Sequence, residues 1–226
     1  DYPKGYREMN DFGFYLVMTN PVVGYVKCAE AAVKAGVKMI QLRMKHASRK
    51  EIIREAREVK LVTAGTDSLF IVNDDPSIAA EVGADGVHAA GGLTGALHVN
   101  DGVVGAGAGA FAALDALVLI NIALAVDKGN GTTVADLLAG GSSTHNLKQV
   151  IASANAPVDY IGVGPVYATP TKDIPDPTLG LNTMKEMIAT ANHPAVAIGG
   201  IDKNHLPDVL SSGAKNFAVV RAVCQS

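Results

Sequence analysis

The chain has 226 residues, two cysteines and a net charge of −3 at pH 7, with an isoelectric point of about 6.1. This balance excludes the strongly basic surface that binding to nucleic acid or to an anionic membrane would require. Cys28 and Cys224 stand far apart without metal-type spacing, which favours a reducing cytoplasm over a disulfide framework. The first 13 residues contain no apolar run of the signal-peptide type, so the sequence predicts a cytoplasmic protein.

Strand and helix patterns alternate along the chain from residue 12 onward. Apolar, β-branched runs predict strands, and amphipathic runs bounded by capping residues or glycine predict helices. One helix begins at Ser48, which precedes Glu51 by three residues, the spacing of a capping box. The expected strands are residues 12–19, 38–44, 69–73, 86–89, 137–141, 160–166, 195–199 and 217–223. The expected helices are residues 26–35, 48–64, 77–82, 146–153, 181–191 and 203–211.

Repeated strand–helix units of this kind predict a parallel sheet covered by helices, an α/β fold. Eight strands favour a closed (β/α)8 TIM barrel of one domain over residues 1–226, and make a doubly wound open sheet the less favoured alternative. In a barrel, the polar residues at the carboxyl ends of the strands line one mouth. The sequence ends at Ser226, which leaves little chain for a last helix. That side of the barrel is therefore expected to be open or covered by the first residues.

A Gly/Ala-rich insertion of about residues 90–140 interrupts the pattern. The 56 residues between His88 and His145 are roughly twice what one helix and one strand need. Residues 103–126 are nearly all apolar and have the length of a membrane span, but Asp115 would be costly near the bilayer centre. A buried helix pair or an interface element is the favoured interpretation.

Two strand ends carry polar groups that suit a magnesium-bound diphosphate. Gln41, Arg43 and Lys45 alternate at the end of the second strand and project to one side. One amide and two cations on one face suit a polyphosphate. The third strand ends in Asn73, Asp74 and Asp75, which offer the hard oxygen ligands that Mg2+ prefers, although a turn leading into the next helix is the plain alternative.

A third group follows the sixth strand. Residues 160–166 are apolar and lead into a loop that Pro170 stiffens, with two hydroxyls and an amine on Thr169, Thr171 and Lys172. A polar turn is again the alternative when the segment is taken alone. Together, the three strand ends predict one anion site at the barrel mouth.

Five segments in order carry a family resemblance: QLRMK at 41–45, NDD at 73–75, STHN at 143–146, GPVYATPTK at 164–172 and IGGI at 198–201. By these segments the chain resembles the thiamin phosphate synthases from about residue 12 to residue 223, apart from the middle. The resemblance implies an Mg2+-dependent transferase. Its small-molecule substrates would be hydroxymethylpyrimidine diphosphate and thiazole phosphate, and its products thiamin phosphate and diphosphate. It also implies a homodimer.

The resemblance assigns roles to individual residues, which divide by the group they would bind. Thr169, Thr171 and the backbone N–H of Gly200 match thiazole-phosphate contacts, and Asp74 matches a magnesium ligand. Lys45, Ser143 and Lys172 are expected to serve catalysis, because stabilising the charge on departing diphosphate accelerates its loss. The residues that match contacts of the pyrimidine diphosphate are Gln41, Arg43, Lys45, Asn73, Ser143 and Lys172.

Besides the middle segment, the chain departs from the family pattern at two positions of the expected site. After residue 88 it reads AAGGL where the family carries a second magnesium ligand, and Asp101 and Asp115 are the alternatives. Arg221 stands where a small serine commonly helps to bind the thiazole phosphate, and arginine would either bind that phosphate more strongly or fill its space.

Two other functions stay open beside the synthase. They are a thiazole tautomerase of the same superfamily and a non-catalytic barrel that binds thiazole phosphate. The diphosphate-binding residues of segments 41–45 and 169–172 favour the synthase. For His88 and His145, the sequence leaves open whether each belongs to the site or to the scaffold.

Overall fold

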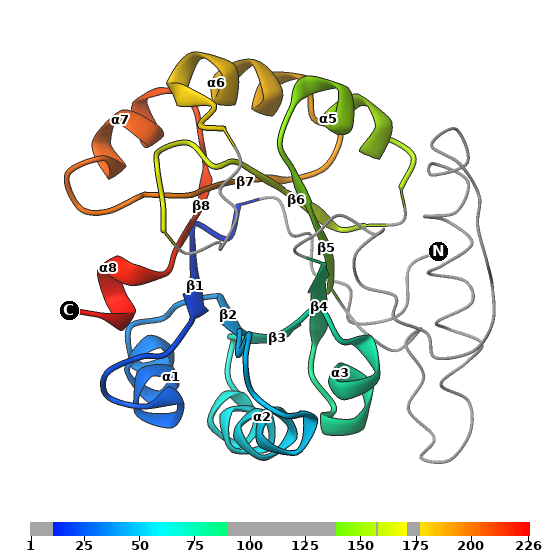
Figure 1. Ribbon diagram of the computed structural model, residues 1–226, viewed down its shortest axis with the longest axis vertical. Coiled ribbons are helices and arrows are strands. Elements are labelled where there is room, and N and C mark those ends of the chain that lie inside the picture. Colours follow the sequence, from blue (N-terminus) through cyan, green and yellow to red (C-terminus); the bar gives the residue numbers. More distant parts are fainter. Residues whose placement is uncertain (1–10, 90–138, 157, 171–176) are drawn as a thin grey trace.

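The computed structural model describes residues 11–89, 139–156, 158–170 and 177–226. Eight parallel strands, each paired with its neighbour and β8 paired with β1, close into a barrel (Figure 1). The strands are β1 (Phe14–Met18), β2 (Met39–Leu42), β3 (Leu69–Asn73), β4 (Gly86–Ala89), β5 (Ala139–Thr144), β6 (Tyr160–Val163), β7 (Ala195–Ile198) and β8 (Asn216–Val219). The predicted (β/α)8 barrel is therefore confirmed.

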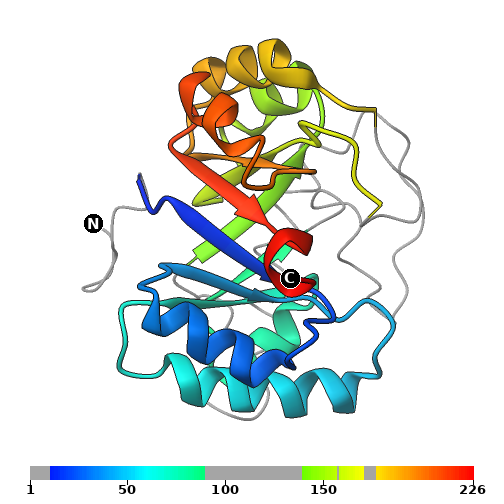
Figure 2. The same ribbon diagram turned by 90° about the vertical axis from the view of Figure 1, so that its left-hand side faces the viewer.

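Helices pack along the outside of the strands, as the side view shows (Figure 2). They are α1 (Tyr25–Lys34), α2 (Arg49–Thr63), α3 (Pro76–Val82), α5 (Leu147–Ser153), α6 (Gly180–Thr190), α7 (Leu206–Ser211) and α8 (Arg221–Cys224). Most of the insertion, with Asp101 and Asp115, lies outside the described residues, so its interpretation stays a prediction.

Local sequence explains where α2 and α3 begin. The hydroxyl of Ser48 accepts a hydrogen bond from the backbone N–H of Glu51, and the Glu51 carboxylate accepts one from the Ser48 N–H at 2.7 Å. The predicted capping box is thus confirmed. Asp75 caps α3 by accepting from the Ile78 N–H at 2.9 Å, and its carboxylate also pairs with Arg49. Asp75 therefore serves the scaffold.

The alternation of strand residues divides the core into two layers. Leu16 and Met18 face outward and pack under the helices, whereas Tyr15 and Val17 face into the barrel. Seven buried residues fill the barrel interior: Tyr15, Val17, Met39, Ile71, Tyr160, Val196 and Ala218. Two tyrosines thus stand among apolar side chains inside the barrel.

The expectation that too little chain remains for a helix after the last strand is wrong, and the alternative of cover by the first residues falls on residues 1–10, outside the described ones. β8 ends at Val219, before the expected residue 223, and the chain then turns into the short helix α8. The Cys224 carbonyl accepts a hydrogen bond from the Val22 N–H at 2.9 Å, which ties α8 to the loop before α1. Cys28 and Cys224 are both free thiols, buried in the same part of the core.

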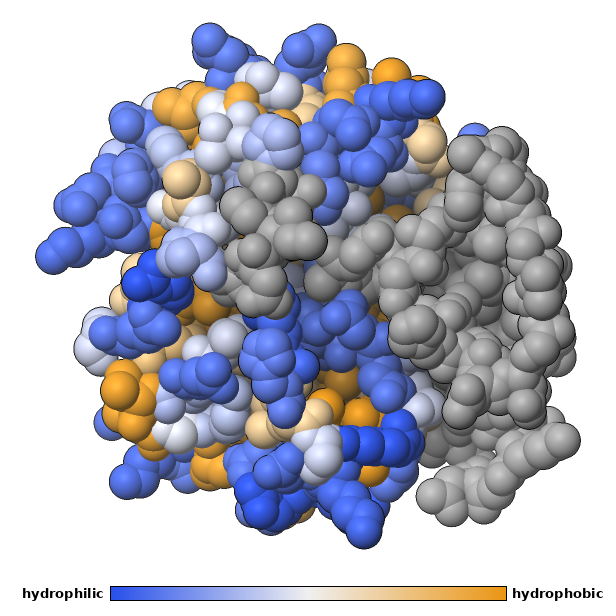
Figure 3. Space-filling model, in the orientation of Figure 1, coloured by the Kyte–Doolittle hydropathy of each residue, from blue (hydrophilic) through white to orange (hydrophobic). Residues whose placement is uncertain are grey.

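The face of the molecule seen in Figure 3 is mainly polar over the described residues. Hydrophilic side chains predominate over the helices, with isolated apolar ones between them (Figure 3). Within the described ranges, every helix is too short or too polar to cross a membrane.

Candidate active site at the barrel mouth

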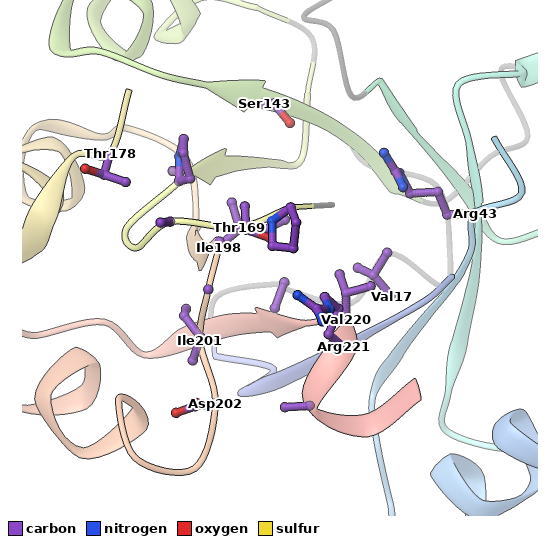
Figure 4. A pocket seen from close by; sticks show the side chains of 18 of the residues that line it. Val17, Arg43, Ser143, Thr169, Thr178, Ile198, Ile201, Asp202, Val220 and Arg221 are labelled. Carbon is purple, nitrogen blue, oxygen red and sulfur yellow. The ribbon is translucent and has the colours of Figure 1, made fainter. Parts of the chain in front are cut away.

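A cavity of about 1130 Å³ opens at the carboxyl ends of the strands. Its wall is assembled from strands and loops far apart in the chain (Figure 4). Six residues with roles assigned from the sequence line it: Gln41, Arg43, Asn73, Ser143, Thr169 and Gly200. The fold thus brings these six together, and their individual roles stay predictions.

Gln41 and Arg43 are almost completely enclosed, at 2% and 7% exposure, although both are polar. A charged guanidinium is costly to bury unless it is paired or hydrogen-bonded. Arg43 extends from the end of β2 beside the cavity, and Ser143 lines the same cavity from β5 (Figure 4). This part of the wall is suited to an anion.

Lys45 and Asp74 lie in the exposed loops that follow β2 and β3, and neither belongs to the residues that line the cavity. Asp74 adopts a left-handed backbone, with φ of 62°, and its carboxylate accepts a hydrogen bond from the Asn73 side-chain amide at 2.6 Å. The other predicted loop residues, Thr171 and Lys172, lie outside the described residues.

The donor set around Asn73 and Asp74 fits a magnesium ion that a substrate brings with it. The Asn73 Oδ1 atom is buried and has no hydrogen-bond partner among the described residues, and Asp74 beside it is exposed. Across the described ranges, nowhere do three or more His, Cys, Asp or Glu side chains form a metal-binding group. Mg2+ is commonly held by one or two carboxylates together with phosphates and water. Asp74 can therefore supply the protein ligand.

A chain of buried hydrogen bonds runs beneath the cavity. The Gln41 amide donates to the Tyr15 hydroxyl at 2.9 Å, and Tyr15 bonds Tyr160 at 2.9 Å. Tyr160 contacts His88 Nδ1 at 3.1 Å, and His88 Nε2 contacts the Ser143 hydroxyl at 3.1 Å. Burial raises the pKa of both tyrosines well above the usual range, so both remain neutral. These hydrogen bonds connect side chains of β1, β2, β4, β5 and β6.

Sequence reasoning missed Tyr15 and Tyr160. The sequence shows each of them only as a tyrosine in an otherwise apolar strand, and a tyrosine in that setting usually belongs to the core. The structure also places both undecided histidines in the cavity wall. His145 donates from Nδ1 to the Gly164 carbonyl at 2.6 Å, which fixes its proton on that nitrogen.

Two glycines allow the loops after β6 and β7 to approach closely. Gly199 and Gly200 have φ of 100° and 65°, a region that favours glycine. A Cβ on Gly199 would lie 2.5 Å from Pro165 Cβ, and one on Gly200 would lie 2.7 Å from the Ala168 carbonyl. Bare backbone therefore forms this side of the cavity.

Arg221, the first residue of α8, lines the cavity with this glycine pair. Its Nε donates to Gln225 at 3.0 Å, and in the described part of the chain its two terminal nitrogens make no hydrogen bond. The cavity thus has one cation at the end of β2 and a second after β8 (Figure 4).

The family model described as thiamine monophosphate synthase matches residues 14–102 and 132–223. The chain belongs to this family. It is 35% identical to the thiamine-phosphate synthase of Persephonella marina over 96% of this chain and 90% of that protein. It is 32% identical to the thiamine-phosphate synthase of Methanococcus maripaludis (strain C5) over 93% of this chain and 86% of that protein.

A solved structure supports the same architecture. The thiamine phosphate pyrophosphorylase of Pyrococcus furiosus superimposes with a TM-score of 0.72, covering 96% of this chain and 89% of that one at 24% identity. TIM barrels carry their active sites at the carboxyl ends of the strands, so the cavity at the barrel mouth is the candidate active site.

Proposed function

We propose that this protein transfers the hydroxymethylpyrimidine group from its diphosphate to the nitrogen of thiazole phosphate, forming thiamin phosphate and releasing diphosphate. The observation that carries the proposal is one cavity at the barrel mouth that is lined by an arginine at the end of β2 and a second arginine after β8. All four residues line this cavity, and we assign Arg43 and Ser143 to the diphosphate and Arg221 with the Gly200 backbone to the thiazole phosphate. A reaction that joins one diphosphate substrate to one phosphate substrate needs contacts for each.

The reaction requires charge stabilisation more than a nucleophile. When the bond between the pyrimidine methylene carbon and the diphosphate oxygen breaks, its electron pair leaves with diphosphate. The Arg43 guanidinium and the Ser143 hydroxyl stabilise that growing charge, and we extend this role to Lys45 and Lys172. The thiazole nitrogen then supplies the electron pair for the new carbon–nitrogen bond, and the wall holds the two substrates in line.

Magnesium would be held by Asp74 together with the diphosphate. Its charge would neutralise that of the leaving group. Asn73 keeps the Asp74 carboxylate in place through its side-chain amide, and its Oδ1, which has no partner in the described part of the structure, remains for a ligand. We assign Gln41 to the pyrimidine substrate and Thr169, Thr171 and Gly200 to the thiazole phosphate.

The direct test supplies the purified protein with both substrates and Mg2+. We expect equimolar thiamin phosphate and diphosphate, and we expect Arg43→Met to lose most of the activity. Arg54→Met is the matched control, because Arg54 is an exposed residue of α2 that pairs with the neighbouring Glu55. A barrel that only binds would take up thiazole phosphate in a calorimeter and form no product. A tautomerase would change the thiazole substrate alone.

The proposed oligomeric state and cellular location rest on the family resemblance and on the amino-acid composition. We propose a homodimer, which sedimentation of the purified protein tests. We also propose a cytoplasmic location, which the two free, buried thiols support.

A further inference from the structure

The series of hydrogen bonds beneath the cavity begins at Gln41, and its first two bonds allow only one assignment of donor and acceptor. Gln41 donates its amide hydrogen to the Tyr15 hydroxyl oxygen. The Tyr15 hydrogen must then go to Tyr160, the other partner of this hydroxyl in the described structure. If Tyr160 donated to Tyr15 instead, the Tyr15 hydrogen would be buried without an acceptor, which native structures avoid.

The same assignment of donors and acceptors extends to the two ring nitrogens of His88. Because Tyr160 accepts from Tyr15, its own hydrogen is available for His88 Nδ1 at 3.1 Å. A neutral imidazole has one donor and one acceptor nitrogen, so the proton of His88 lies on Nε2. Nε2 therefore donates to the Ser143 oxygen at 3.1 Å. Stacking of the His88 and Tyr160 rings, with centroids 5.6 Å apart, holds the imidazole in this orientation.

The last member of the chain faces the cavity. The Ser143 oxygen accepts from His88, and in the described residues its own hydrogen has no acceptor. Its side chain lines the cavity (Figure 4). The hydroxyl is consequently a donor toward whatever anion binds there.

We infer that Tyr15, Tyr160 and His88 are positioning residues that hold Ser143 as a hydrogen-bond donor toward the departing diphosphate. The identity of the anion rests on the proposed function, whereas the order of the hydrogen bonds rests on the structure alone. The same order argues against a serine nucleophile, because a general base must accept the serine proton and His88 donates one.

Nitrogen-15 NMR of histidine-labelled protein tests the order of hydrogen bonds without any substrate. The His88 signals are assigned by their absence in His88→Gln. We expect Nδ1 to be unprotonated and Nε2 protonated in the wild type, and the preference to weaken in Tyr160→Phe, which cannot donate to Nδ1. A wild-type His88 protonated on Nδ1 overturns the inference.

Two substitutions of His88 distinguish the role of its Nε2 atom from that of its Nδ1 atom. The amide nitrogen of glutamine can take the place of Nε2 and donate to Ser143, whereas the amide of asparagine reaches only the place of Nδ1. We expect His88→Gln to retain most activity. We expect His88→Asn to lower kcat by about 10- to 100-fold with little change in the KM of the pyrimidine diphosphate. Equal losses in both variants overturn the role of Nε2.

Double variants show whether His88 and Tyr160 act through Ser143. Once Ser143→Ala has removed the hydroxyl, adding His88→Asn or Tyr160→Phe is expected to change kcat by less than about twofold. If the second substitution lowers kcat in the Ser143→Ala background by the same factor as in the wild type, the inference is overturned.

Thermal unfolding identifies variants that do not fold, and Tyr15→Phe replaces Tyr160→Phe in that case. If the wild type makes no thiamin phosphate, the proposed function and the diphosphate role fail together, and the NMR result still decides the hydrogen-bond order.

Discussion

His88 of β4 and Tyr160 of β6 touch across the intervening strand because Gly141 of β5 has no side chain. The three residues are in register, His88 beside Gly141 and Gly141 beside Tyr160. A Cβ on Gly141 would lie 2.2 Å from Tyr160 Cζ and 2.6 Å from His88 Nδ1. One glycine therefore makes room for the contact that reaches Ser143.

Gly141→Ala is expected to push the two rings apart. Overpacking of this kind costs typically about 1–3 kcal/mol, so we expect a drop of at least that order in the free energy of unfolding, together with lost activity. Urea unfolding and the synthase assay measure the two effects. Gly162→Ala is the matched control, because the nearest atom to its Cβ would be 3.7 Å away. Equal effects of the two variants would contradict the packing argument.

Arg221→Ser is expected to raise the KM for thiazole phosphate by about tenfold or more, the value of one charge-assisted hydrogen bond. The KM for the pyrimidine diphosphate should change little, because we assign Arg43 to that substrate. Steady-state kinetics with each substrate varied in turn measures the two KM values separately. Arg54→Ser on the outer face of α2 is the control. A lower KM for thiazole phosphate would instead mean that Arg221 fills the space of the phosphate.

Asp74→Asn is expected to raise the Mg2+ concentration needed for half-maximal activity by about tenfold or more, because asparagine is a neutral and weaker ligand. The unfolding free energy should stay close to that of the wild type. Asp75→Asn is the neighbouring control, since Asp75 caps α3 and pairs with Arg49. Activity titrated with Mg2+ measures the shift. If Asp75→Asn shifted the Mg2+ requirement as much as Asp74→Asn, the magnesium assignment would be wrong.

The α2 capping box should make stability depend on pH. Hydrogen bonds from the Ser48 hydroxyl and backbone N–H hold the pKa of Glu51 below its ordinary value. A lowered folded-state pKa contributes stability above the unfolded-state pKa of about 4.3, and this contribution is lost as pH falls through the folded value. We expect the wild type to exceed Glu51→Gln in stability at pH 7 and the difference to shrink below about pH 4. Urea unfolding at several pH values checks this, with Glu58→Gln as the control. A difference that grows toward acid pH would reverse the sign and contradict the argument.

Local signals in the sequence predicted most of the barrel. The apolar run at β3 and the Ser48–Glu51 spacing each depend on neighbouring residues, and both appear in the structure as expected. The end of β8 was misjudged because the apolar run VVRAV continues into α8, and an apolar pattern of that length fits a strand or a buried helix.

The cavity wall was predictable only in part. Gln41, Arg43 and Asn73 stand at strand ends, where barrel topology alone brings them together. Tyr15, Gly141 and Tyr160 gave no such signal, because their contact depends on the register of three strands across the barrel. Register is a long-range property that neighbouring residues in the chain do not encode.

The central claim is that one cavity holds both substrates, with the diphosphate at Arg43 and Ser143 and the thiazole phosphate at Arg221 and Gly200. A crystal structure with thiamin phosphate, diphosphate and Mg2+ tests it most directly. We predict diphosphate oxygens within hydrogen-bonding distance of the Arg43 guanidinium and Ser143 Oγ, with Mg2+ on Asp74 and the phosphate of the product beside Gly200. Products bound elsewhere, or a diphosphate without contact to Arg43 and Ser143, would contradict the account.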